Sequence, residues 1–410
     1  MKGPTARRQQ EVALQLGGST VIVTKQMFGA LSDDPTDPLS RVSVANSSFS
    51  LDPYRGCPVG CRYCTVAGAE RDIDIMRAAN GEAQRITLPR MPQSLFSGRS
   101  LATAIMQHPF FIRDRSVVSI GTGSTESFLP TVESTTWEIV ETFLREDCRN
   151  PFWVVTKLGL PDRLVERWQG RFALLADRNI PVVLSITYSA APSWMEPYEG
   201  NRFRNIEAMR RVGVKIAHHL RPVIPGINDS VACIRKAIDA SSGLAEVICA
   251  GGLRRDPGVD VAWQHVYGLS PCLLPSSGAR GKKHSPDDYV GRAREYLKGK
   301  GQAHIPIVRR SSEAIAFLLS IPEYNLYGYR PDDERCFLSV PTLIQRQVAE
   351  RAGAPLAALI EREARRIGLV GLHVAVEGDE VSIDRELTYQ EHRALIHAVG
   401  HADVLPRNHV

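Results

Sequence analysis

A repeated pattern between residues 47 and 250 constrains the fold of this 410-residue chain more than any other feature. Short apolar stretches without strict alternation are each followed by a helical pattern, which is typical of buried parallel strands in βαβ units. The predicted strands are residues 48–52, 117–121, 153–156, 182–187, 214–220 and 246–249. The predicted helices are residues 101–107, 137–144, 164–175, 204–211 and 231–241. We therefore predict an α/β fold, a partial (β/α)6 barrel with right-handed crossovers.

Three further segments flank the predicted barrel. Residues 1–46 are predicted to form an irregular N-terminal leader, and residues 251–330 an irregular region that closes the barrel or contacts substrate. After residue 330 the pattern changes to helices and short strands, two of them joined by a Gly-Asp turn that favours a β-hairpin. These elements are predicted at residues 340–352, 356–367, 369–376, 381–383 and 389–399. We therefore expect a small C-terminal α+β unit over residues 331–410.

The composition is that of an ordinary soluble globular protein, with 43% hydrophobic and 23% charged residues. The net charge of +5 suits an anionic ligand, and it suits a basic surface without a ligand equally well. No run of about 18 apolar residues predicts a membrane span. Gln9, Gln10, Glu11 and Gln15 interrupt any apolar core of a signal peptide. We expect a cytoplasmic protein with no membrane partner.

Three of the eight cysteines, Cys57, Cys61 and Cys64, lie within eight residues of one another. The others are scattered along the chain: Cys148, Cys233, Cys249, Cys272 and Cys336. In a reducing compartment a tight cysteine group is more often metal-binding or catalytic than disulfide-bonded. The CxxxCxxC spacing offers three thiolates to a [4Fe–4S] cluster and leaves one iron without a protein ligand.

Two glycines suit this loop to a cluster. Gly56 and Gly60 give the backbone the freedom to wrap around iron and sulfur, and the exposed amides of such a loop stabilise an anionic group. A zinc site is the alternative interpretation. Zinc sites usually bring a second cysteine pair or histidines at a characteristic spacing, and the sequence has neither. The pattern favours the cluster.

The cysteine motif, with Tyr63 before its last cysteine, resembles the radical S-adenosylmethionine superfamily when the barrel repeats that follow it are considered. Within that superfamily, residues 52–57 (DPYRGC) are similar to the Asn-Pro-Tyr-Arg-Gly-Cys sequence of the spore photoproduct lyase-like subgroup, apart from Asp52. Further similar segments keep the same order: residues 125–130 (TESFLP), 155–157 (VTK), 195–197 (MEP), 204–213 and 221–229 (RPVIPGIND). The resemblance covers residues 47–250 and leaves residues 330–410 unmatched.

The resemblance implies two cofactors, a [4Fe–4S] cluster and S-adenosylmethionine. In this family the open iron binds the amino and carboxylate groups of S-adenosylmethionine. One electron, from a donor such as flavodoxin or ferredoxin, then splits the sulfonium into methionine and a 5′-deoxyadenosyl radical. The radical abstracts a hydrogen atom from the substrate, while the protein fixes that hydrogen against the adenosyl group.

Active sites of parallel barrels lie at the carboxyl ends of the strands, so polar residues there are candidate ligands of S-adenosylmethionine. These candidates are Gly121, Thr122, Gly123, Ser124, Lys157, Ser185, Thr187 and Arg221. The resemblance adds Tyr63 and Glu196. The glycine-rich turn suits the amino acid part of the cofactor, whereas Lys157 and Arg221 suit a carboxylate. For each candidate a purely structural hydrogen bond is the alternative interpretation.

Cys249, at the end of the sixth predicted strand, is a candidate hydrogen donor to a substrate radical because an S–H bond is weak. Cys272 and Cys336 are less well-placed alternatives, and a free cysteine is more often a small buried hydrophobe. His218 and His219 lie in an apolar strand, and we expect at least one of them to be a packing residue.

Three functions remain open. We favour a small-molecule substrate, such as a sugar or natural-product precursor, with epimerisation as one specific outcome if a thiol donor exists. Dehydrogenation, rearrangement or a lyase reaction would begin with the same step. Repair of a DNA lesion is the first alternative, although the chain has no basic, aromatic-interleaved stripe that would favour nucleic acid. A non-catalytic iron–sulfur scaffold is the second.

Overall fold

The computed structural model describes most of the chain in separate ranges. These are residues 10–16, 19–25, 30–32, 34–45, 48–64, 92–122, 126–198, 200–254, 283–284, 288–321, 336–338, 353–377, 380–385 and 387–400. None of the helices in these ranges combines the length and the apolar content that a bilayer crossing needs.

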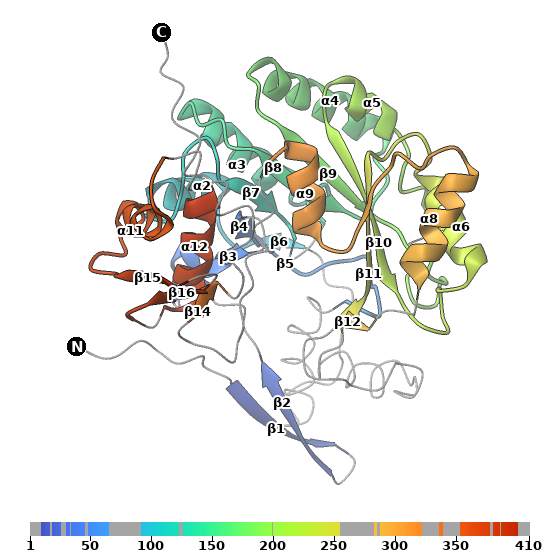
Figure 1. The fold of residues 1–410 in the computed structure, drawn as a ribbon. Coiled ribbons are helices and arrows are strands. Elements are labelled where there is room, and N and C mark those ends of the chain that lie inside the picture. The colour runs from blue at the N-terminus through green and yellow to red at the C-terminus, as the bar shows by residue number, and fades with distance from the viewer. Residues whose placement is uncertain are drawn as a thin grey trace.

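A nine-stranded sheet forms the centre of the structure (Figure 1). Its strands are β3 (Val42–Ala45), β4 (Ser48–Leu51), β7 (Val117–Ile120), β8 (Phe152–Thr156), β9 (Val182–Thr187), β10 (Lys215–Val223), β11 (Val247–Arg254), β12 (Lys283–His284) and β13 (Ile307–Val308). Their order is β12–β11–β10–β9–β8–β7–β4–β3, with β13 on β11. All neighbours pair in parallel except β3 and β12, which are antiparallel at the two ends. The six predicted parallel strands are confirmed, and the described strands form an open sheet.

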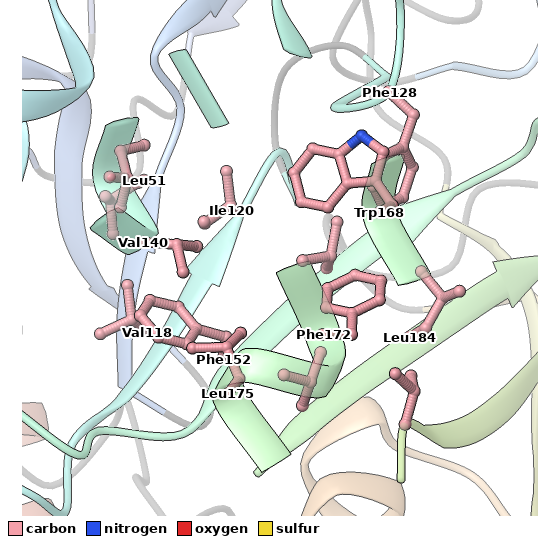
Figure 2. Close-up of a cluster of buried hydrophobic side chains, with 14 of the residues drawn as sticks. Leu51, Val118, Ile120, Phe128, Val140, Phe152, Trp168, Phe172, Leu175 and Leu184 are labelled. Carbon is pink, nitrogen blue, oxygen red and sulfur yellow. The ribbon is translucent and has the colours of Figure 1, made fainter. Parts of the chain in front are cut away.

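Helices cover both faces of this sheet. They are α2 (Gly98–Gln107), α3 (Glu133–Arg145), α4 (Asp162–Asp177), α5 (Ile206–Arg211), α6 (Val231–Ala240), α8 (Tyr289–Gly299) and α9 (Ser311–Leu319). Because successive residues of a strand point to opposite faces, each strand supplies two cores. On one face Val118, Phe152 and Leu184 pack with Trp168 and Phe172 of α4 (Figure 2). On the other face, α9 packs on a separate apolar cluster: Val117, Trp153, Val183, Ala217, Val247 and Cys249.

The segments at both ends of the chain differ in part from their predictions. The leader, predicted to be irregular, contains the antiparallel strands β1 (Gln10–Leu16) and β2 (Ser19–Lys25), the short helix η1 (Pro38–Arg41) and β3. An alternating apolar pattern from Val21 to Val23 opposite Val12 and Leu14 is the signal that the prediction missed.

The C-terminal α+β unit is confirmed. It contains β14 (Cys336–Leu338), α11 (Leu356–Arg366), β15 (Val374–Glu377), β16 (Glu380–Ile383) and α12 (Tyr389–Gly400), with sheet order β14–β16–β15. The predicted strand 369–376 begins only at Val374, because Gly368 and Gly371 adopt positive φ angles and form turns. The helix predicted at residues 340–352 lies outside the described residues. Gln390 Oε1 accepts a hydrogen bond from the Val44 amide at 2.6 Å, which attaches this unit to β3.

His218 is a buried packing residue on β10, as predicted for at least one of the two histidines. Its Nε2 lies 2.7 Å from the Tyr188 carbonyl oxygen, and its Nδ1 lies 2.8 Å from the Ser241 hydroxyl. Burial lowers the pKa of His218 to about 4. The ring is therefore neutral at physiological pH.

We expect acid to destabilise the protein through His218. An unfolded histidine titrates near 6.5, so between that pH and about 4 the unfolded chain binds a proton that the folded chain does not. The contribution of the neutral ring to stability is complete above pH 6.5 and is lost as the pH falls, by about 3 kcal/mol. Urea unfolding at neutral pH and near pH 4 measures this loss, which should be smaller in His218→Gln. Equal losses in both proteins would contradict the assignment.

Candidate active site

The cysteine loop, residues 56–64, lies against the carboxyl ends of the parallel strands. Its buried residues Val59, Cys61 and Tyr63 share one apolar cluster with Met195, Ile224 and Leu253. Ile224 directly follows β10, and Leu253 lies near the end of β11. The Arg62 amide also donates a hydrogen bond to the Met195 carbonyl at 2.9 Å. The loop therefore occupies the edge of the sheet where parallel α/β proteins bind their ligands.

Residues before the loop fix its entry. Arg41, at the end of η1, donates from Nε to the Asp52 carbonyl at 2.8 Å and from Nη2 to the Tyr54 carbonyl at 3.0 Å. The strands β5 (Tyr54–Arg55) and β6 (Gln93–Ser94) pair just before the first cysteine. Gly56 and Gly60 adopt φ angles of 82° and 70°, a region that favours glycine. The sequence prediction included both glycines and did not include Arg41.

The three cysteines suit an iron–sulfur cluster. Cys61 is buried, and Cys57 and Cys64 are half-buried beside it. Burial raises the pKa of the Cys61 thiol to about 12, so a thiolate at this position needs a nearby positive charge such as iron supplies. In the described part of the chain no three His, Cys, Asp or Glu side chains are arranged to hold a metal ion. The thiolates of a cube bind separate irons, so they need not converge on one point as the ligands of a single ion do.

Lys157 and Glu196 form a buried ion pair beside the loop. The Lys157 Nζ lies 3.2 Å from Glu196 Oε1 and donates to the Tyr63 hydroxyl at 2.6 Å. Glu196 Oε1 also lies 3.9 Å from Cys61 Sγ. Burial works to raise the pKa of Glu196, but the charges of Lys157 and Arg202 hold that pKa below its usual value. Three residues predicted to bind cofactor, Tyr63, Lys157 and Glu196, therefore form one network with the central cysteine.

Two residues of this network were missed by the sequence prediction. Arg202 lies 2.7 Å from Glu196 Oε1 and is itself buried. Glu126 accepts hydrogen bonds from the Thr156 hydroxyl at 2.7 Å and from the Lys157 amide at 2.9 Å, and so holds the end of β8. Burial raises the pKa of Glu126. Glu126 lies within residues 125–130, which are similar to the spore photoproduct lyase-like subgroup, so this resemblance could have identified it. For Arg202 the sequence offered no comparable signal.

Four of the other candidate ligands contact protein groups. Ser185 is fully buried, and its hydroxyl accepts a hydrogen bond from Trp153 Nε1 at 2.8 Å. Thr187 is buried at the end of β9. The Gly121 amide donates to the Leu51 carbonyl at 3.0 Å, and the Thr122 hydroxyl lies 2.6 Å from the Ser50 hydroxyl. The candidates Gly123 and Ser124 lie outside the described residues.

Arg221 of β10 and Cys249 of β11 contact one another. Arg221 donates to Cys249 Sγ at 2.6 Å, to the Ser311 hydroxyl at 2.8 Å and to the Arg309 carbonyl at 3.1 Å. Its guanidinium packs against Gly251, where an added Cβ atom would lie only 2.9 Å from Arg221 Nε and would therefore displace the arginine. Cys249 is fully buried, and its sulfur is engaged by this guanidinium rather than open to a substrate. Of the alternative donors, Cys336 lies on β14 in the C-terminal unit and Cys272 lies outside the described residues.

A cavity of about 770 Å³ lies away from this network, between α6 and α8. Its charged lining includes Arg235, Asp288, Arg292, Glu295 and Lys300. None of its lining residues belongs to the cysteine loop or to the ends of β8 and β9. We therefore place the candidate site at the loop, where the titratable and metal-binding residues gather, rather than at this cavity.

Comparison with known proteins shows a distant likeness to a solved structure. No family model matches the chain, and no curated protein is significantly similar to it. The chain is similar to a solved structure of a spore photoproduct lyase double mutant with bound AdoMet and a dinucleoside spore photoproduct. The two are 11% identical, the match covers 65% of this chain and 78% of that chain, and the TM-score is 0.46.

Proposed function

We propose that this chain is a radical S-adenosylmethionine enzyme that holds a [4Fe–4S] cluster on Cys57, Cys61 and Cys64. One observation carries the proposal: the three cysteines lie on a loop packed over the carboxyl ends of parallel strands, with Lys157 and Tyr63 beside them. When bound, the cluster and S-adenosylmethionine supply reductive cleavage of a sulfonium and a radical that abstracts hydrogen.

Lys157 is the residue best placed to bind the carboxylate of S-adenosylmethionine. An ammonium donates three hydrogen bonds, and the Lys157 Nζ has two acceptors, the Tyr63 hydroxyl and Glu196. Among the described residues the third proton meets no acceptor, so we propose that it binds an anionic ligand. The carboxylate of Glu196 is already shared by two cations, so its role is to orient them rather than to bind the ribose.

The residues around the loop also restrict water. Val59, Met195 and Leu253 surround Cys61 with apolar side chains, and Met195 is fully buried. A site that produces a radical needs such surroundings, because water and stray hydrogen donors would otherwise compete with the substrate. We propose that the substrate enters above this apolar layer.

For the substrate we favour a small molecule such as a sugar or natural-product precursor, with flavodoxin or ferredoxin as electron donor. The modest net charge of +5 supports a small substrate over a long nucleic acid. Epimerisation with Cys249 as hydrogen donor is the least supported outcome, because Arg221 contacts the sulfur.

Repair of a DNA lesion is the second candidate, favoured by the order of the sequence motifs and by α11. The exposed face of α11 carries Arg362, Arg365 and Arg366, although Glu363 pairs with two of them. A gel shift with lesion-containing DNA that weakens steeply with salt would support this candidate.

The proposal predicts the outcome of anaerobic reconstitution. The protein should bind about four irons per chain and, on reduction with dithionite, release 5′-deoxyadenosine from S-adenosylmethionine. Iron determination and chromatography of the nucleoside measure the two quantities. Protein that takes up zinc but no iron would refute the proposal. Protein that holds iron without cleaving S-adenosylmethionine would instead support the scaffold alternative.

A further inference from the structure

The Arg202 side chain has four polar partners around the site. It is 4% exposed and lies in the segment between β9 and α5. Nη1 lies 2.7 Å from Glu196 Oε1 and donates to the Lys157 and Thr187 carbonyls, both at 3.2 Å. Nη2 donates to the Tyr198 carbonyl at 3.0 Å. Two of the three guanidinium nitrogens thus contact four protein acceptors, which holds the planar group in one orientation.

These partners come from three separate parts of the chain. Lys157 directly follows β8, Thr187 ends β9, and Glu196 and Tyr198 belong to the segment after β9. The Arg202 guanidinium also lies 5.4 Å and 5.1 Å from the ring centres of Tyr188 and Tyr198. A single side chain therefore fixes the relative position of two strand ends and of the carboxylate that faces Cys61.

The contact with Glu196 extends this constraint to the cysteine loop. Glu196 Oε1 receives Arg202 at 2.7 Å and Lys157 at 3.2 Å, so the carboxylate is placed mainly by the nearer arginine. Lys157 in turn donates to the Tyr63 hydroxyl, one residue before Cys64. The path from Arg202 to the loop thus consists of Glu196, Lys157 and Tyr63, each at hydrogen-bond distance from the next.

We infer that Arg202 is a positioning residue. Through Glu196, it holds the Lys157 ammonium in a fixed position relative to the cysteine loop. The expected effect of Arg202 on the binding of S-adenosylmethionine rests on the proposed function. The inference also applies to the iron-free protein, in which Arg202 keeps the loop seated so that Cys61 stays buried against Met195 and Leu253.

Arg202→Lys tests the inference, with Arg204→Lys as its matched control. Lysine keeps the positive charge but cannot bridge a carboxylate and three carbonyls at once. Arg204 is two residues away, 54% exposed, and pairs with the exposed Asp162 at 2.7 Å. In iron-free protein we expect Cys61, which is 4% exposed, to be alkylated by iodoacetamide about tenfold faster in Arg202→Lys than in wild type or Arg204→Lys. Peptide mass spectrometry measures the rate at this cysteine alone.

Reconstituted protein provides the second readout. Arg202→Lys should bind as much iron as wild type, while its KM for S-adenosylmethionine rises about tenfold and its kcat changes little. An unchanged alkylation rate together with an unchanged KM would overturn the inference and leave the proposed function intact. Failure of wild type to bind iron would refute the proposed function, and the alkylation rates would still decide the role of Arg202.

A second variant covers the case in which Arg202→Lys does not fold. Glu196→Gln keeps the shape of the side chain and removes the charge that draws Arg202 and Lys157 together. We expect the same faster alkylation of Cys61 and the same rise in KM. Folded Glu196→Gln protein with wild-type values for both would overturn the inference.

Discussion

Replacing Cys61 with alanine is expected to abolish iron binding and the release of 5′-deoxyadenosine. Outer-shell substitutions at metal sites typically cost 10–100-fold, so loss of a ligand should lower the rate by at least about a hundredfold. Cys61 is the central cysteine of the motif and the most buried of the three. Among the described residues, Cys57, Cys61 and Cys64 are the cysteines that belong to or pack against the apolar cluster around the loop, so no further cysteine there could replace the lost ligand. Iron content and nucleoside release after reconstitution measure the effect.

Cys233→Ala is the matched control for this experiment. Cys233 is a half-buried free cysteine in the first turn of α6, on the outer side of the sheet. Its removal should leave both iron content and nucleoside release at the wild-type level. A Cys61→Ala protein that retained its cluster and still cleaved S-adenosylmethionine would exclude the proposed site.

Glu196→Ala is expected to lower the free energy of unfolding by about 3–5 kcal/mol. The carboxylate is 2% exposed and lies between the Lys157 ammonium and the Arg202 guanidinium. Its removal takes away the carboxylate that both cations share, in a site from which water is largely excluded. The cost follows from the loss of this charge compensation rather than from the small volume that is lost. Urea unfolding followed by circular dichroism measures the change.

The control for this prediction is Glu207→Ala on α5. Glu207 is 51% exposed and pairs with Arg210 at 3.4 Å and Arg211 at 3.8 Å. Water solvates all three charges, so its loss should change the free energy of unfolding by less than about 1 kcal/mol. Similar losses in both variants, or a Glu196→Ala protein as stable as wild type, would show that the buried carboxylate is not a counter-ion.

The fold was predictable because buried parallel strands have a distinct pattern. Stretches such as residues 182–187 are apolar on both faces, and all six residues of β9 are buried. Each strand is followed by an amphipathic helix, so the pattern fixes the type of sheet as well as its strands. The weaker predictions concern the ends of the chain. The β1–β2 hairpin has an alternating apolar pattern that the prediction missed, whereas β14 has only three residues, and its partner cannot be read from the strand itself.

The site was only partly predictable, for a different reason. The cysteine spacing and the polar residues at strand ends are local in sequence, and Lys157 was predicted in this way. Tyr63 and Glu196 were predicted from the resemblance to a known family. Arg202 acts through carbonyl oxygens of residues 4 to 45 positions away, which no local pattern reports. Arg221 was predicted as a cofactor ligand because it ends a strand, but position on a strand does not show which groups already occupy its guanidinium.

The placement of α9 has a consequence for how the chain is made. The helix occupies residues 311–319, so it leaves the ribosome after every strand of the main sheet has been synthesised. Until then Val117, Trp153, Val183, Ala217 and Val247 present an uncovered apolar surface. A nascent chain at that stage exposes the kind of apolar surface that chaperones recognise. This surface is buried only after α9 has been synthesised and has packed on the sheet, where Arg221 donates a hydrogen bond to Ser311.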